Sequence, residues 1–182
     1  MNVTLKKGSN LAYILILSLL YPAVLGSIFY SVFSNLSAFR IGVIEISCAL
    51  MMVSVIVFFS IDFLFTYLPE EYNTFHFISD CVLLLVMQGA FSSINFLSGH
   101  NNSRRYCFYM LLTFLVFLLW DWLQRRELGE RYVSILKLEL ILCSAFLLLT
   151  LKENSGHVIP SALSMIGALS MVRLFVGSIT PR

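Results

Sequence analysis

Long apolar stretches separated by short polar connections make up most of this chain of 182 residues. A helix needs roughly 20 apolar residues to cross about 30 Å of hydrocarbon. The pattern predicts an all-α integral membrane protein, with residues 1–182 as a single transmembrane domain and spans at about 11–33, 41–68, 75–98, 106–123, 133–151 and 159–179. The six spans fall to four or five if the shorter stretches lie in the membrane interface.

Prolines and small residues indicate where these helices bend, end or pack. Pro22 predicts a kink in the first span, and Pro69 predicts the end of the second. Small residues line helix contacts in membranes because they let backbones approach. We therefore expect protein-facing surfaces where small and polar residues gather, which are Gln88, Gly89, Ser92 and Ser93 in the third span and Ser161, Ser164, Gly167, Ala168 and Ser170 in the sixth.

Two segments that contain acids match when the chain is shifted by 59 residues. Segments 58–80 and 117–139 each end one apolar span, cross a charged connection and enter the next span. The shift aligns Asp62 with Asp121, Glu71 with Glu130, and Asp80 with Glu139. We predict that helices two and three repeat as helices four and five, in two hairpins of parallel topology.

The composition excludes several classes of protein. Hydrophobic residues make up 59% of the chain and charged residues 12%, with a mean hydropathy of +0.88, so a soluble core of ordinary make-up is excluded. The net charge is +2 and the basic residues are scattered, so we expect no direct nucleic-acid binding. The four cysteines lack CxxC spacing and the three histidines lie in different connections, so we expect no metal or cofactor. The cysteines fit small apolar packing positions.

Basic residues set the expected orientation. The end that would carry both termini and the two acidic connections collects Lys6, Lys7, Arg125, Arg126, Arg131, Lys137 and Arg182. By the positive-inside bias, this end and both termini are predicted to face the cytoplasm of a bacterial inner membrane. Most of the acids then lie near that face, namely Asp62, Glu70, Glu71, Asp80, Asp121, Glu127, Glu130 and Glu139.

The simplest interpretation of these acids is structural. Asp80 and Glu139 would favour the positive ends of their helices, and the acids of the connections would pair with arginines in a solvated rim. A second interpretation is a docking surface for a cytosolic protein, formed by Glu70, Glu71, Arg125, Arg126, Glu127, Glu130 and Arg131.

A third interpretation is a site inside the membrane. Asp62 and Asp121 would lie about one turn inside a hydrophobic end, where a carboxylate is costly unless it is paired or protonated. These two acids could face a shared interior and bind a cation or a proton, and Asp80, Glu139 and Arg173 are the other intramembrane polar residues of this hypothesis. Glu45 and Arg173 are the other charges within spans, and we predict that Arg173 meets Asp62 or Asp121.

Catalytic signals are weak in this chain. Ser98 with His100, and Ser155 with His157, share turns, but no nucleophile-elbow motif accompanies them and a glycine already explains each turn. No enzyme is therefore predicted. The remaining aromatic residues of note fit interfacial anchors, and they are Trp120, Trp122, Tyr67, Tyr106 and Tyr132.

In size, in the lack of a soluble domain, and in its short spans joined by the charged connections PEEYNTF and QRRELGERY, the chain resembles the KwaA family of membrane subunits from the Kiwa anti-phage system. The resemblance implies a homo-oligomeric sensor and scaffold that recruits a DNA-binding cytosolic partner to the inner membrane. We therefore expect a non-enzymatic, oligomeric scaffold or sensor that recruits a cytosolic effector. The alternative is a small cation or proton transporter or channel that uses Asp62 and Asp121.

Overall fold

The computed structural model describes residues 14–36, 42–65, 74–94, 103–123, 132–152 and 156–179. The secondary structure within these ranges is helical throughout. A short π-helical segment, η1 (Ile16–Leu20), precedes six α-helices, and these are α2 (Tyr21–Leu36), α3 (Val43–Phe65), α4 (Thr74–Ser92), α5 (Ser103–Leu123), α6 (Tyr132–Leu151) and α7 (Val158–Ile179). The all-helical prediction is confirmed for the described ranges.

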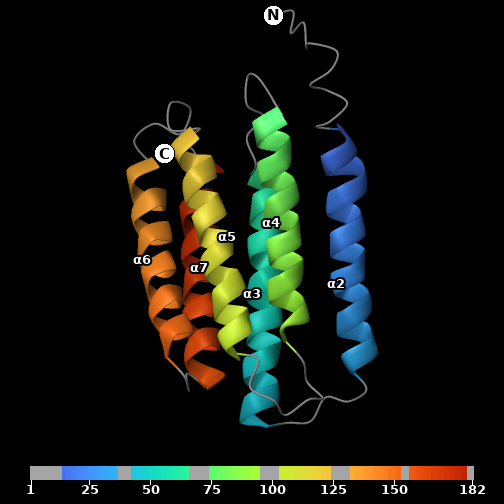
Figure 1. The fold of residues 1–182 in the computed structure, drawn as a ribbon, viewed down its shortest axis with the longest axis vertical. Helices are drawn as coiled ribbons and strands as arrows, with labels where there is room; N and C mark the ends of the chain where they lie inside the picture. The colour runs from blue at the N-terminus through green and yellow to red at the C-terminus, as the bar shows by residue number, and fades with distance from the viewer. Residues whose placement is uncertain are drawn as a thin grey trace, which may run out of the picture.

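Successive helices run in opposite directions along the long axis of the bundle (Figure 1). The helices α3 and α5 end where α4 and α6 begin, and we call this the acidic end. The helix α2 also begins at the acidic end, and the last helix, α7, ends there. The opposite end holds the start of α3, α5 and α7.

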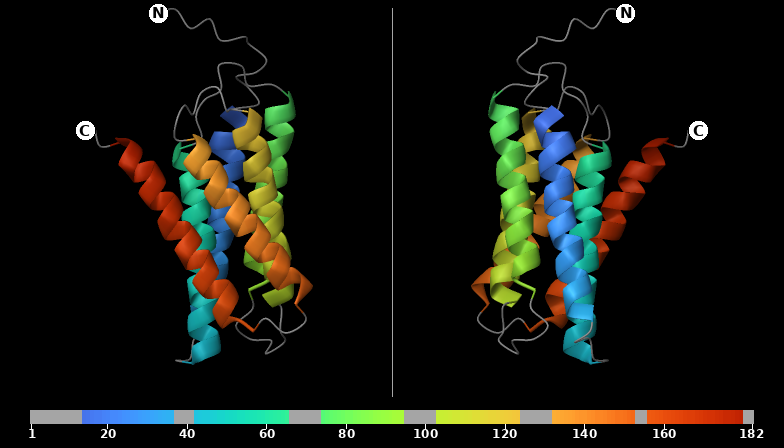
Figure 2. Two further views of the ribbon diagram at one scale, coloured as in Figure 1. Left: turned by 90° about the vertical axis from the view of Figure 1, so that its left-hand side faces the viewer. Right: turned by 90° about the vertical axis from the view of Figure 1, so that its right-hand side faces the viewer.

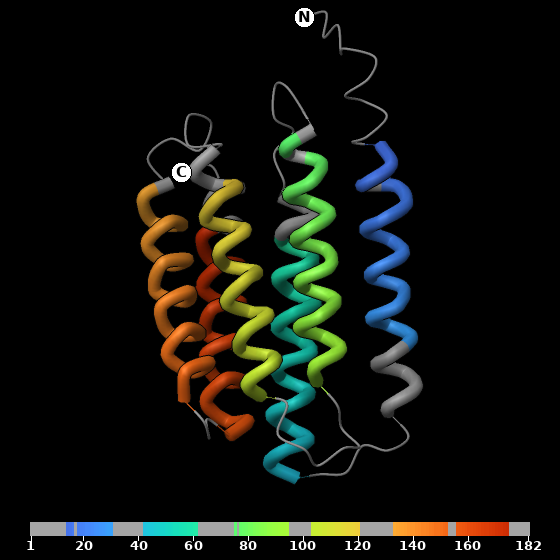
Figure 3. Tube along the Cα trace, viewed as in Figure 1, coloured from blue at the N-terminus to red at the C-terminus, as the bar shows by residue number. Residues whose placement is uncertain are grey.

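The helices pack in unequal pairs. The helix α5 lies against α4 on one side and α6 on the other, whereas α3 packs mainly along α7 and makes few contacts with α4. The helix α2 lies at one edge of the bundle, beside α4 (Figure 3). The helix α7 is inclined to α3, and the two diverge towards the acidic end (Figure 2).

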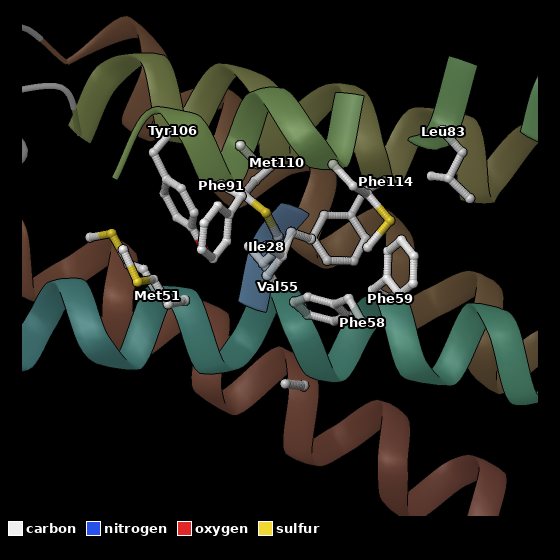
Figure 4. Close-up of a cluster of buried hydrophobic side chains, with 14 of the residues drawn as sticks. Ile28, Met51, Val55, Phe58, Phe59, Leu83, Phe91, Tyr106, Met110 and Phe114 are labelled. Atoms are coloured by element: carbon white, nitrogen blue, oxygen red, sulfur yellow. The ribbon is translucent and has the colours of Figure 1, made fainter. Parts of the chain in front are cut away.

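Aromatic rings fill the centre of the bundle. Phe114 on α5 is fully buried, and its ring meets Phe58 of α3 edge-on at 5.2 Å and stacks on Phe146 of α6 at 5.7 Å. Figure 4 shows Phe58, Phe59 and Phe114 pointing into the space between the helices. Such ring pairs contribute about 0.5–1.5 kcal/mol each beyond their area. They join α5 to α6, the next helix in the chain, and to α3, which lies two helices earlier.

Two glycines allow the closest helix contacts. A Cβ on Gly89 of α4 would lie 2.5 Å from the ring of Tyr109 on α5, and one on Gly167 of α7 would lie 3.0 Å from Leu142 on α6. Around Gly167, the side chains of Ser161, Ser164 and Ala168 are also buried. The expected packing surface of the sixth span is confirmed there. In the third span Ser93 is buried, but Ser92 is exposed, so that part of the expectation is wrong.

Helix ends and irregularities have local causes. Ser92 and Ser93 both donate hydroxyl hydrogen bonds to the Gly89 carbonyl, which competes with the helix and ends α4 at Ser92. The other irregularity is the π-helical segment η1. There the Tyr21 N–H donates to the Ile16 carbonyl, five residues earlier, which widens the helical turn just before Pro22. A π segment thus lies just before Pro22, and the kink near Pro22 stays a prediction.

Glu45 sits at the start of α3 rather than inside the bundle. It is the third residue of the helix, and its carboxylate folds back over Gly42, where a Cβ would collide with Oε2. The Ile46 N–H donates to the Gly42 carbonyl at 3.0 Å. This arrangement resembles a capping box, in which a third-position glutamate covers the first helical turn. The position explains the charge without a functional site.

Three of the described helices are long and apolar enough to cross a membrane, over Val43–Ile61, Ser103–Trp120 and Val133–Leu151. Shorter apolar helices cover Ser18–Tyr30, Phe77–Ser92 and Val158–Leu174. The described part of the chain therefore has the character of a membrane protein, with three candidate spans. The count of six spans stays a prediction.

Replacing Gly89 with alanine should destabilise the bundle, because the new methyl group meets the Tyr109 ring. Overpacking of this kind costs about 1–3 kcal/mol. The matched control is Gly26→Ala in α2, where nothing lies within 4 Å and helix propensity favours alanine. Thermal unfolding in detergent should show a lower Tm for Gly89→Ala and no loss for Gly26→Ala. Equal Tm values for both variants would contradict this packing.

Candidate functional site: carboxylates at the acidic end

The fold brings the acidic segments of four helices to one end. Asp62 lies three residues before the end of α3, and Asp121 lies two residues before the end of α5. Asp80 and Glu139 lie in the second turns of α4 and α6, which begin at the same end. The side chains of Asp62 and Asp121 lie outside the described part of the structure, so only their place along the helices is known.

Asp80 and Glu139 are both buried. The exposed fraction is 6% for Asp80 and 2% for Glu139, and Glu139 Oε2 is inaccessible to solvent. Each side chain takes part in interactions within the fold. Acidic side chains are rarely buried to this degree unless they are partnered. Attraction to the helix dipole fades beyond the first turn, so the positive helix end does not by itself explain this burial.

The helix α5, which packs against both α4 and α6, has a buried tryptophan near the acidic end. Trp120 of α5 has an exposed fraction of 8% and lies three residues before the end of its helix, near the acidic end. Leu83 and Leu84, one turn beyond Asp80, are each 3% exposed. Because α5 packs against both α4 and α6, the two buried carboxylates lie on the two neighbours of one helix. The interior at this end is therefore mostly apolar, which makes an ionised carboxylate costly.

Some buried positions of the two hairpins follow the same shift of 59 residues as the acids. Part of the positions buried in α3 and α4 recur as buried positions in α5 and α6, whereas others, such as Phe58 and Phe91, align with partly exposed residues. The buried pairs are Ser47 and Tyr106, Cys48 and Cys107, Met51 and Met110, Met52 and Leu111, Ser54 and Thr113, Val55 and Phe114, Asp80 and Glu139, Leu83 and Leu142, and Met87 and Phe146. Ser54 and Thr113 each donate to the carbonyl four residues earlier.

The helix pairing does not follow this shift. The helix α5 packs closely along α6, but α3 makes few contacts with α4 and packs along α7 instead. The two segments thus share some inward-facing positions, but the helices that these positions face differ. The parallel hairpin repeat is supported by the inward-facing pattern alone, and it stays a prediction.

A second polar contact lies deep in the bundle, away from the acids. The Tyr106 hydroxyl is 2.8 Å from Ser164 Oγ, and Ser164 also donates to the Pro160 carbonyl at 2.7 Å. Tyr106 is 1% exposed, so its prediction as an interfacial anchor is wrong, as it is for buried Trp120. The burial of Tyr106 could have been predicted only through its partner Ser164, which belongs to the small-residue surface of the sixth span. The contact links α5 to α7 in the core.

Other predicted residues have varied outcomes. Arg173 is exposed on α7, and its predicted contact with Asp62 or Asp121 stays a prediction, since the side chains of those acids are not described. The docking residues lie in connections outside the described residues, and they are Glu70, Glu71, Arg125, Arg126, Glu127, Glu130 and Arg131. The described helix ends on either side of both connections, the ends of α3 and α5 and the starts of α4 and α6, lie at the acidic end.

The described residues give little support for metal or nucleophile chemistry. Among them, no group of three or more His, Cys, Asp or Glu residues is arranged to hold a metal ion. All four cysteines have free thiols, and Cys48 and Cys107 are buried in the helix core, in keeping with apolar packing. His157 precedes α7, and its carbonyl accepts a hydrogen bond from the Ser161 N–H at 3.1 Å. Partial burial lowers the pKa of His157, so it is neutral at pH 7.

No protein-family model, curated protein or solved structure matches this chain.

Proposed function

We propose that the protein is a non-enzymatic, oligomeric scaffold or sensor in a bacterial inner membrane, and that its acidic end recruits a cytosolic effector protein. The observation that carries the proposal is the shared end of the helices. The connections 66–73 and 124–131 join helix ends that lie at the same end of the bundle. This shared end of the flanking helices supports a single soluble partner that meets both connections.

Charge supports a protein partner at this end. The two connections carry acids and arginines together, as Glu70, Glu71, Glu127 and Glu130 with Arg125, Arg126 and Arg131. Mixed charges of this kind give an interface specificity and a preferred orientation rather than general attraction to polyanions. The resemblance to Kiwa membrane subunits adds that the partner would be a DNA-binding effector of anti-phage defence, and that several copies of the chain would assemble.

Reversing the acids of both connections should abolish partner capture. We expect full-length protein that carries Glu70→Lys, Glu71→Lys, Glu127→Lys and Glu130→Lys to lose a soluble protein that copurifies with the wild type from its native host. The matched control reverses exposed cations at the opposite end, Arg105→Glu and Lys152→Glu, and should keep the partner. Quantitative mass spectrometry of the purified complexes measures both. If wild type captures no soluble protein, or if the control loses as much, the scaffold proposal fails.

A second function is favoured by one observation, the burial of Asp80 and Glu139. Ionisable groups inside a membrane bundle commonly mark ion or proton pathways. In this alternative, the chain is a small cation or proton transporter or channel in which Asp80 and Glu139 take part, with Asp62 and Asp121 nearer the helix ends. A carboxylate in such surroundings can take up and release a proton as its environment changes.

Neutral variants of the buried acids separate this alternative from a purely structural role. If the chain conducts, purified protein in liposomes should pass a proton or potassium flux that falls at least tenfold in Asp80→Asn and Glu139→Gln. Glu45→Gln, which alters an acid at the opposite end, should keep the flux. Fluorescent pH and potassium indicators inside the liposomes report it. A wild type without flux would remove the alternative and leave the scaffold proposal intact.

A further inference from the structure

Two cations lie on the outer surface of the bundle, within helices rather than at their tips. Lys137 is five residues from the start of α6, and Arg173 is six residues before the end of α7. Both side chains are exposed. At about 1.5 Å per residue, they stand about 8 Å and 9 Å inside the helix ends. In a bilayer whose edges coincide with the helix ends, this depth is near the boundary between lipid headgroups and acyl chains.

The surface around each cation is apolar. Val133, Leu140 and Ile141 lie one helical turn from Lys137 on the same side of α6, and Ile141 is 64% exposed. Leu169 and Ile166 lie one and two turns before Arg173 on α7, and each is 62% exposed. A side of this kind faces acyl chains when the helices are in a bilayer. The long Lys and Arg side chains must then extend along it towards the headgroups.

Both cations belong to the same end and to neighbouring helices. The helix α6 begins and α7 ends at the acidic end, and the two helices are in contact. The carboxylates of this end whose side chains are described, Asp80 and Glu139, are buried inside the bundle. They are therefore not on the outer surface that carries Lys137 and Arg173. Among the acids of this end whose side chains are described, none lies on that surface, so its positive charge can meet an anion from outside the protein.

We propose that Lys137 and Arg173 bind the headgroup of an acidic phospholipid at the acidic end of the bundle. The phosphate of such a lipid accepts charge-assisted hydrogen bonds from an ammonium and a guanidinium group. Its net negative charge distinguishes it from a zwitterionic lipid, which also carries a phosphate. Lipid headgroups lie at the depth of these two side chains, and acyl chains of the same lipid cover the apolar residues beside them.

The test compares purified full-length protein in nanodiscs of pure phosphatidylcholine and in nanodiscs with phosphatidylglycerol. Wild type should unfold at a higher temperature with phosphatidylglycerol, and the variant Lys137→Gln with Arg173→Gln should lose that gain. Arg105→Gln with Lys152→Gln, which removes two exposed cations at the opposite end, should keep it. Lys137→Arg with Arg173→Lys should also keep it, because the charge is preserved.

Native mass spectrometry gives a second readout that does not depend on how well a variant folds. Wild-type protein in a mixture of the two lipids should retain phosphatidylglycerol in preference to phosphatidylcholine. Each neutralised cation should weaken that preference about fivefold. The proposal is overturned if wild type shows no preference. It is also overturned if the neutral variant loses stability equally in both lipids, the result expected if Arg173 pairs with an acid of the protein.

Discussion

Removing a charge or an unpaired backbone amide from water into hydrocarbon costs several kcal/mol, and this constraint governs the arrangement of the chain. A helix satisfies its own backbone, so helices are the structure that an apolar chain can hold in a membrane. The charged side chains are moved to the ends, as Glu45 is over Gly42 at the start of α3. At the start of α5, Arg104 donates to the Thr150 carbonyl at the end of α6, at 3.0 Å. Among the described charged side chains away from the helix ends, Lys137 and Arg173 are exposed on the outer surface, whereas Asp80 and Glu139 are buried.

Asp80 and Glu139 therefore need a reason to be where they are. They occupy equivalent positions under the shift of 59 residues, and both are buried, although the helices that carry them have different neighbours. A buried acid keeps its place if the interior holds it with other groups, and both side chains do have such interactions. The same surroundings make the protonation state sensitive to small changes in structure. A sensor and a proton pathway would both use that sensitivity, which is why the two proposed functions involve the same end.

The sequence predicted the helices better than their packing. Apolar length located the helices, proline marked the irregular turn before Pro22, and small residues marked the close contact at Gly167. The sequence did not predict that α3 would pair with α7, or that Tyr106 would be buried against Ser164. The reason is that α5 and α6 are apolar on nearly every side, so polarity does not reveal which side faces the protein. In a membrane, shape and small residues select the contacts.

The same limit applies to the candidate site. Pairing of acids in the sequence identified Asp80 and Glu139, because acids are rare in apolar spans and their recurrence is visible in one chain. The repeat set these two acids apart from Glu45, but it did not predict that Asp80 and Glu139 would be buried and that Glu45 would have a capping position. Exposure of Arg173 was likewise not predicted, since its depth along the sixth span suggested an internal partner. Whether a charged side chain faces the protein interior or the outside depends on how its helix is rotated about its own axis. The sequence did not predict that rotation.

The central claim is that both acidic connections lie on one side of the membrane. Single cysteines at Glu71→Cys, Glu130→Cys and Asn101→Cys, in a background with Cys48, Cys81, Cys107 and Cys143 replaced by alanine, test it in intact cells with a thiol reagent that cannot cross the membrane. The account predicts that positions 71 and 130 share one labelling pattern and that position 101 shows the opposite one. Labelling of 71 and 130 from different sides, or of all three from the same side, would contradict it.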